Sequence, residues 1–189
     1  MDHPAGLLPA VAIEPGFEQV VLVDDSGAPI GTCPKAEVHT TSTPLHLAFS
    51  CWLLDGAGSV LLTRRALTKI TWPGIWTNAC CGHPAPGEPN EDAVRRRVGQ
   101  ELGIRLTGLR LALPTFRYLA TMDDGTQENE ICPVFVASTP DVLAPDPAEV
   151  ADWTWTEVGA LARRVESGDV RLSPWLRMQF PLLVAGGWL

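Results

Sequence analysis

A loop–helix–loop segment over residues 82–104 constrains the possible fold more than any other part of the chain. Its helix is predicted over residues 91–102, because Asn90 is a good N-cap residue. Gly103 follows as a residue that can adopt the left-handed conformation at the helix end. Apolar side chains spaced four apart predict one buried stripe on this helix, made by Val94, Val98 and Leu102.

Apolar and alternating runs on either side of this helix predict strands at 19–24, 45–54, 59–65, 77–81, 113–122, 126–137 and 150–155. Turn residues predict two hairpins, one joining 45–54 to 59–65 and one joining 113–122 to 126–137. Further helices are predicted over about 157–167 and from Pro174 onward, with Ser173 as a cap and Pro181 as a stop or kink. This order indicates an α+β fold, an α/β/α sandwich around a mixed β-sheet.

A length of 189 residues suits one domain, expected over residues 17–185 behind a loosely ordered lead-in over residues 1–16. The net charge of −8, without a long basic run, argues against nucleic acid or an anionic membrane as a partner. No apolar run approaches the ~20 residues that span a bilayer, and no secretory signal is recognised. Five cysteines without a Cys-x-x-Cys pair indicate reduced thiols. We therefore expect a cytoplasmic monomer.

Three histidines and two glutamates are candidate metal ligands: His39, His46, His83, Glu128 and Glu130. The two glutamates lie two apart in a predicted strand, so they project from the same face. Side-by-side carboxylates repel each other unless a cation lies between them or one is protonated. The alternative is that they form a solvated hairpin edge. Five nitrogen and oxygen ligands favour a six-coordinate divalent ion, with Mn²⁺ preferred over Zn²⁺ or Mg²⁺.

The spacing of Gly82, five residues, Glu88, seven residues and Arg96 opens a motif that runs to Ile104. It resembles the Nudix box, G-x5-E-x7-R-E-U-x-E-E-x-G-U, where U is aliphatic. Nudix hydrolases use helix glutamates of this box to hold Mg²⁺ against a diphosphate. Here Arg97 and Gln100 replace two of them and Glu101 remains. The resemblance implies the Nudix fold, while the replacements weaken the case for hydrolysis.

Further segments resemble the type 1 isopentenyl diphosphate isomerases, over roughly residues 18–180. They include Leu45–Ser50, Thr63–Leu67, Trp72–Asn78, Cys81–Pro84, Phe116–Tyr118, Glu128–Phe135 and Ser173–Trp175. The resemblance implies interconversion of isopentenyl and dimethylallyl diphosphate in isoprenoid biosynthesis, through a tertiary carbocation. It implies that the five candidate ligands named above bind the first metal ion. It also implies that Glu101 and the backbone of Cys81 bind a second ion, Mg²⁺, which arrives with the substrate.

The same resemblance implies catalytic roles for Cys81 and Glu130 on opposite faces of the substrate, with Tyr118 coupled to the glutamate. Which of the two gives the proton and which removes it is left open. Trp175 would offer its ring to the carbocation, although core packing is the alternative for any tryptophan. The positions that match diphosphate contacts are Lys35, Arg65, Lys69 and Arg97. Arg95 and Arg96 are expected to be structural or solvent-facing.

Two rival functions remain possible on the sequence. A Nudix hydrolase acting on a nucleoside diphosphate derivative would leave Cys81 and Trp175 without a role. A non-catalytic binding module stabilised by a metal would be insensitive to Cys81→Ala and would unfold on metal removal.

Overall fold

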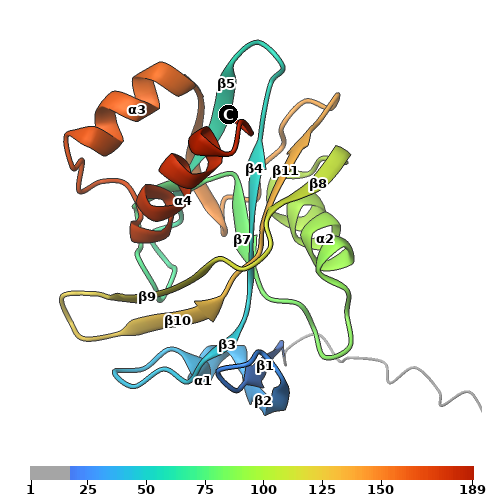
Figure 1. Ribbon diagram of the computed structural model, residues 1–189, viewed down its shortest axis with the longest axis vertical. Coiled ribbons are helices and arrows are strands. Elements are labelled where there is room, and N and C mark those ends of the chain that lie inside the picture. Colours follow the sequence, from blue (N-terminus) through green and yellow to red (C-terminus); the bar gives the residue numbers. More distant parts are fainter. Residues whose placement is uncertain (1–17) are drawn as a thin grey trace, which may run out of the picture.

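The computed structural model describes residues 18–189, and over that range its strands form three β-sheets with helices on both sides (Figure 1). One side carries α2 (Asn90–Leu102), and the other carries α3 (Val158–Glu166) and α4 (Pro174–Ala185). The predicted α+β class is confirmed. The lead-in predicted over 1–16 lies outside the described residues, and the single domain predicted over 17–185 stays a prediction.

The central sheet has the order β7-β4-β11-β8, comprising Cys80–Gly82, Phe49–Leu53, Val134–Ser138 and Thr107–Leu113. Every residue of β4 is buried, because the strand is covered on both faces. Phe49, Cys51 and Leu53 pack in the apolar cluster that includes α2, whereas Trp52 packs in the cluster that includes α4. The strand alternation thus assigns each side chain to one layer.

A second sheet continues from the central one, with the order β2-β1-β3-β10-β9. Its strands are Pro29–Pro34, Gln19–Val23, His46–Leu47, Gln127–Ile131 and Arg117–Thr121. The chain passes from β3 to β4 and from β10 to β11, and both neighbouring pairs run parallel. Pro133 has no N–H to donate to a ladder, so the strand predicted over 126–137 is divided in two. The hairpin predicted for 113–122 and 126–137 is confirmed only for β9 and β10.

The third sheet has the order β12-β5-β6, comprising Val150–Glu157, Ser59–Arg65 and Trp76–Asn78. It corrects the predicted hairpin between 45–54 and 59–65. A turn held by Asp55 does join these segments, but they share one isolated bridge, between Leu54 and Val60. Beyond it they diverge, because β4 pairs with β7 and β11 while β5 pairs with β6 and β12.

The helix ends test the predicted caps. Gly103 is left-handed, with φ of 68°, and its N–H donates to the oxygen of Gly99, as predicted. Asn90 is wrong as the N-cap, because the helix already includes it and Pro89 precedes it without a side-chain hydrogen bond. Ser173 is confirmed as a cap, since its side chain accepts from the Leu176 N–H. Pro181 does not end α4, which runs on to Ala185.

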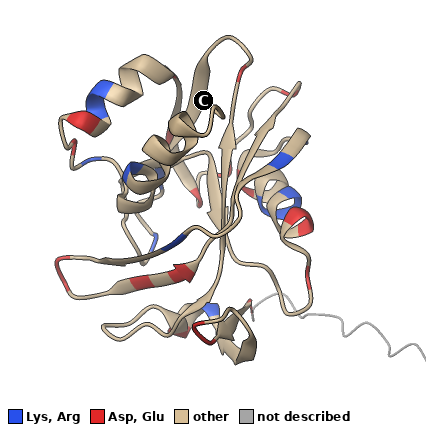
Figure 2. Cartoon of the chain, in the orientation of Figure 1, with Lys and Arg blue, Asp and Glu red and all other residues tan. Residues whose placement is uncertain are grey.

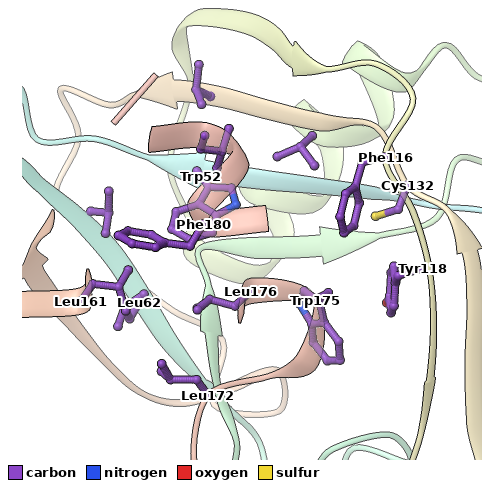
Figure 3. Close-up of a cluster of buried hydrophobic side chains, with 14 of the residues drawn as sticks. Trp52, Leu62, Phe116, Tyr118, Cys132, Leu161, Leu172, Trp175, Leu176 and Phe180 are labelled. Carbon is purple, nitrogen blue, oxygen red and sulfur yellow. The ribbon is translucent and has the colours of Figure 1, made fainter. Parts of the chain in front are cut away.

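A large apolar cluster joins α4 to the sheets (Figure 3). Trp52, Leu176 and Phe180 lie in its interior, and Trp175 and Tyr118 lie toward one edge of it. The latter two rings have centroids 5.9 Å apart. This edge forms a wall of the main pocket, so the core holds two of the predicted catalytic side chains. Within the described range, the helices all lack the length and apolar character needed to cross a bilayer.

Candidate active site

The main pocket has a volume of about 530 Å³ and lies where the β9–β10 hairpin, α1 (Lys35–Val38), the 66–75 loop and the start of α4 meet. Eleven of the predicted site residues line it: Lys35, His39, Arg65, Lys69, Cys81, His83, Arg97, Tyr118, Glu128, Glu130 and Trp175. His46 and Glu101 are buried just behind them and contact lining residues. Segments from across the chain therefore converge as the sequence predicted.

Three imidazoles and one carboxylate form a cluster at the base of this pocket. His39, His46, His83 and Glu130 each offer one ligand atom, and these atoms lie within 4.8 Å of one another. Strand register explains part of the cluster, because His46 on β3 is directly beside Glu130 on β10. His39 follows α1 and His83 follows β7, so the loops deliver the other two rings.

The protonation of two of the three imidazoles suits a divalent ion, whereas at His46 burial, which lowers the pKa, is outweighed by Glu130, and the pKa is raised. Burial lowers the pKa of His39 to about 3 and also lowers the pKa of His83, which keeps both imidazoles neutral at pH 7. Glu130 Oε1 lies 3.2 Å from His83 Nε2 and 3.5 Å from His46 Nε2. Burial opposes the ionised form of Glu130, but these imidazoles hold its pKa well below the usual range.

Three buried ring nitrogens have no hydrogen-bond partner among residues 18–189: His39 Nε2, His46 Nε2 and His83 Nδ1. Buried polar atoms are normally paired, because leaving one unpaired costs about 1–3 kcal/mol. Neutral imidazoles beside an ionised carboxylate are good ligands for Mn²⁺ or Zn²⁺. The donor set therefore fits the predicted metal centre.

Glu128 lies beside this cluster but has a different partner. Figure 2 shows two acidic bands on β10, which belong to the buried positions of that strand, Glu128 and Glu130. The hydroxyl of Tyr118 on β9 donates to Glu128 Oε2 at 2.5 Å. Burial and the charge of Glu130 raise the pKa of Glu128. Its carboxylate is not within the four-residue cluster, so its assignment as a fifth ligand stays a prediction.

Cys81 is held in the pocket wall by β7. Its Sγ lies 3.3 Å from Ser50 Oγ and donates to Asn78 Oδ1 at 3.4 Å. Burial raises the pKa of the thiol to about 12, so it is protonated at pH 7. Trp175, which is 1% exposed, donates from Nε1 to the same Asn78 oxygen at 3.2 Å. The guanidinium of Arg65 lies 5.7 Å from the Trp175 ring centroid.

Lys35, Lys69 and Arg97, which we call the basic end of the pocket, are cations that are paired with carboxylates. Lys35 forms an ion pair with Glu18, and Lys69 forms one with Glu149. Arg97 Nη2 donates to Glu101 at 2.5 Å and lies 3.4 Å from a Glu149 oxygen. The helix residues Arg97 and Glu101 are four apart, so they share one face of α2. Each of these three basic groups thus has at least one carboxylate partner.

The other two arginines of the helix take structural roles, as expected. Arg96 makes a two-pronged contact with Glu88, with both N···O distances at 2.7 Å, and also donates to the His83 carbonyl. Arg95 donates to the Leu106 carbonyl. Glu88, the first glutamate of the box motif, thus orders the loop that carries His83 through Arg96.

Several residues that complete the site were missed in the sequence. Asn78 and Ser50 hydrogen-bond to Cys81, and Gln179 hydrogen-bonds to Ser50. Glu149 forms an ion pair with Lys69. Gln179 had a detectable signal, because it lies four residues after Trp175 on the apolar stripe of α4 and a buried amide there needs partners. Glu149 had none, since it lies in a loop and meets Lys69 only through tertiary folding.

Comparisons with known proteins show the family and the fold of the chain. A family model described as a NUDIX domain matches residues 44–176. In fold, the chain is similar to DR0079 from Deinococcus radiodurans, with a TM-score of 0.66 and 17% identity over 85% of this chain and 96% of that one. It is also similar to a MutT NUDIX hydrolase from Burkholderia pseudomallei, with a TM-score of 0.58 and 20% identity over 74% of this chain and 98% of that one. Most of the residues that line the pocket therefore lie within a NUDIX domain.

Relatives of much higher identity narrow this class. The chain is 56% identical over 167 residues to an isopentenyl-diphosphate Delta-isomerase from Paenarthrobacter aurescens, covering 88% of this chain and 91% of the relative. It is 57% identical over 170 residues to one from Mycolicibacterium vanbaalenii, covering 90% and 93%. This chain belongs to the isopentenyl-diphosphate Delta-isomerase family of the NUDIX superfamily. The predicted family and fold are confirmed, and the isomerase is favoured over the hydrolase alternative.

Proposed function

We propose that this pocket interconverts isopentenyl diphosphate and dimethylallyl diphosphate by moving a proton on and off the five-carbon chain. The observation that carries the proposal is the meeting of a thiol, a carboxylate pair, an aromatic ring and a group of basic side chains in one pocket. A proton added to the terminal alkene carbon would produce a tertiary cation at C3. Loss of a proton from C2 would then complete the shift of the double bond.

Cys81 and Glu130 are proposed to act on opposite faces of the substrate, one as acid and the other as base. Tyr118 and Glu128 support the carboxylate side, since the Tyr118 hydroxyl already donates to Glu128. Each turnover leaves the acid without its proton and the base with one more. Solvent exchange would restore both groups, so the substrate incorporates a solvent proton. The direction of transfer stays open.

Trp175 is proposed to stabilise the cation with its ring, and its burial makes this stabilisation stronger than at an exposed site. A desolvated cation–π contact contributes about 2 kcal/mol or more. The ring lies between Tyr118 and Arg65, which limits its motion. The apolar side chains of this wall also limit the access of water, which would otherwise trap the cation as an alcohol.

The diphosphate is proposed to bind Lys35, Arg65, Lys69 and Arg97. Arg65 is preorganised, because its Nε and Nη2 donate to the backbone and hydroxyl oxygens of Thr71. The lysines and Arg97 would exchange their carboxylate partners for phosphate oxygens. Glu101 and the Cys81 backbone are the proposed ligands of a Mg²⁺ ion that arrives with the substrate.

For the first ion we propose Mn²⁺, with Zn²⁺ or Mg²⁺ as alternatives, held by His39, His46, His83, Glu128 and Glu130. When bound, such an ion supplies positive charge that stabilises ionised carboxylates. We further propose that the enzyme acts as a cytoplasmic monomer. Its acidic net charge of −8 and its free cysteines support that proposal.

A single incubation tests the reaction. Purified protein is incubated with isopentenyl diphosphate, Mg²⁺ and Mn²⁺ in deuterated water, and the product is examined by mass spectrometry and NMR. Dimethylallyl diphosphate carrying deuterium is the expected result. Unlabelled product would contradict the proton-transfer mechanism, and phosphate release from nucleotides without isomerisation would favour a hydrolase.

A further inference from the structure

Asn78 is a fully buried polar residue at the end of β6, and both hydrogens of its amide group are used. Its Nδ2 donates to the backbone oxygen of Cys51 at 2.9 Å and to that of Cys80 at 3.1 Å. Backbone carbonyls only accept hydrogen bonds, so the amide nitrogen must face them. The orientation of the side chain is therefore determined, and Oδ1 must point the other way.

This Oδ1 atom accepts from two side chains that line the pocket. The Cys81 thiol donates to it at 3.4 Å, and Trp175 Nε1 donates to it at 3.2 Å. Thr77 Oγ1 donates to the same oxygen at 3.0 Å and also lies 2.9 Å from Ser173 Oγ, at the cap of α4. One atom thus joins the thiol on β7 to the indole at the start of α4.

A second contact holds the thiol from the other side. Ser50 Oγ lies 3.3 Å from Cys81 Sγ and accepts from Gln179 Nε2 at 2.8 Å. Gln179 Oε1 accepts in turn from Trp52 Nε1 at 2.9 Å. Gln179 lies one helical turn after Trp175, so the network returns to the helix from which the ring projects.

Such a network matters because proton transfer is sensitive to small displacements. Misplacing a reacting group by about 1 Å can lower a rate by roughly 10²-fold. A thiol is a weak hydrogen-bonding group on a single rotatable bond, so packing at an open pocket wall orients it poorly. A fully satisfied buried network supplies the missing rigidity.

We propose that Asn78 is a positioning residue, whose Oδ1 holds the Cys81 sulfur and the Trp175 ring in one relation to the reacting carbons. The proton-transfer group and the cation-stabilising ring then act at the same place. This inference rests on the proposed roles of Cys81 and Trp175. The competing explanation is structural: the Nδ2 bonds tie β6 to its neighbouring backbone, and Oδ1 is incidental.

Two substitutions separate these explanations. Asn78→Leu removes the oxygen and the amide donors, whereas Asn78→Asp keeps an oxygen acceptor and loses at least one donor bond. We expect Asn78→Leu to lower kcat by about 10²-fold and Asn78→Asp to lower it by less than about tenfold. The KM for isopentenyl diphosphate should stay within about twofold in both, since the side-chain hydrogen bonds of Asn78 within residues 18–189 go to no basic residue.

Thr63→Val is the matched control. Thr63 is buried, and its hydroxyl donates to the backbone oxygens of Asn78 and Ala79, at 3.0 and 3.5 Å, without touching the Asn78 side chain. It should lower the melting temperature with kcat unchanged. Steady-state kinetics and thermal melts of all three variants, with Asn78→Ala replacing the leucine variant if the latter does not fold, complete the comparison.

An equal fall of kcat in the aspartate variant and the oxygen-free variant would overturn the positioning role, as would an unchanged kcat in the oxygen-free variant. A kcat loss in Thr63→Val that matches its loss of stability would also overturn it. Cys81→Ala and Trp175→Phe are measured alongside. Wild-type kcat in either would instead refute the catalytic roles on which the inference rests, so the two failures are distinguishable.

Discussion

The two ends of the pocket are built on different principles. At the end with the thiol, the side chains come from strands and a helix start, and they are nearly inaccessible: Trp175 is 1%, Glu130 5% and Tyr118 6% exposed. At the basic end, the side chains of Lys35 and Lys69 remain 29% and 22% exposed and pair with carboxylates. We propose that the first end is preorganised for chemistry and that the second exchanges partners to bind and release an anion.

The most severe test of this contrast is Cys81→Ala. Removing a proton-transfer group at the rigid end should lower kcat by roughly 10²–10⁴-fold while leaving KM nearly unchanged. Cys33→Ala is the control, because this partly exposed thiol lies on β2 and, within residues 18–189, its hydrogen bond goes to the Pro34 carbonyl oxygen and not to a pocket residue. Steady-state kinetics check both variants, and a comparable loss in the control would refute the assignment.

Metal removal should have the next largest effect, again confined to the rigid end. Chelation should slow isomerisation, by less than the loss of the Cys81 thiol does, and lower the melting temperature, since an ion present at about 100 times its dissociation constant stabilises the fold by about 2.7 kcal/mol. His39→Gln should copy most of this loss, while Glu166→Gln, an exposed change on α3, should not. Elemental analysis and thermal melts measure the outcome, and full metal content in the His39 variant would contradict the ligand assignment.

Substitutions at the basic end should move KM rather than kcat. Lys69→Met should raise KM for the diphosphate about tenfold, because one charge-assisted contact is worth roughly 1.5–3 kcal/mol. Glu149→Gln should lower KM a few-fold, since it frees Lys69 and Arg97 from a competing carboxylate. Calorimetric titration with inorganic diphosphate at two salt concentrations gives the same comparison without turnover. A changed kcat with constant KM would reverse the contrast.

The smallest effect should come from the scaffold that supports both ends. Gly103→Ala should cost about 1–2 kcal/mol of stability, because φ is +68° and a Cβ would meet the Ala144 oxygen at 2.8 Å. Gly99→Ala, inside the same helix, has its nearest contact at 3.8 Å and should stabilise by about 0.5–1 kcal/mol. Denaturant unfolding measures both, and kcat should stay constant in each.

Much of the local structure was predictable because its causes are local. The buried stripe on α2, the left-handed Gly103 and the Ser173 cap follow from nearest-neighbour geometry. The shared face of Glu128 and Glu130 follows from strand alternation. The Asn90 cap was wrong, because Pro89 is already suited to the preceding extended position and leaves Asn90 inside the helix.

Strand pairing was the weaker part, because it depends on which edges the rest of the chain occupies. The turn at Asp55 has hairpin chemistry, yet β4 lies between β7 and β11 and has no free edge for β5. Pro133 was visible in the sequence, and it separates β10 from β11, which lie in two different sheets. That separation also depends on the parallel neighbouring segment, in which Ala48 lies between β3 and β4 and bonds to Ile131.

The sequence was sufficient for the family, the α+β class and eleven of the side chains that line the pocket, because motif spacing and residue chemistry are properties of the chain. It was not sufficient for the contacts that orient them. The shared oxygen of Asn78, the Gln179–Ser50 pair and the Glu149–Lys69 pair join distant segments. Such contacts exist only after the layers pack, because their distances depend on the positions of whole strands and helices rather than on neighbouring residues.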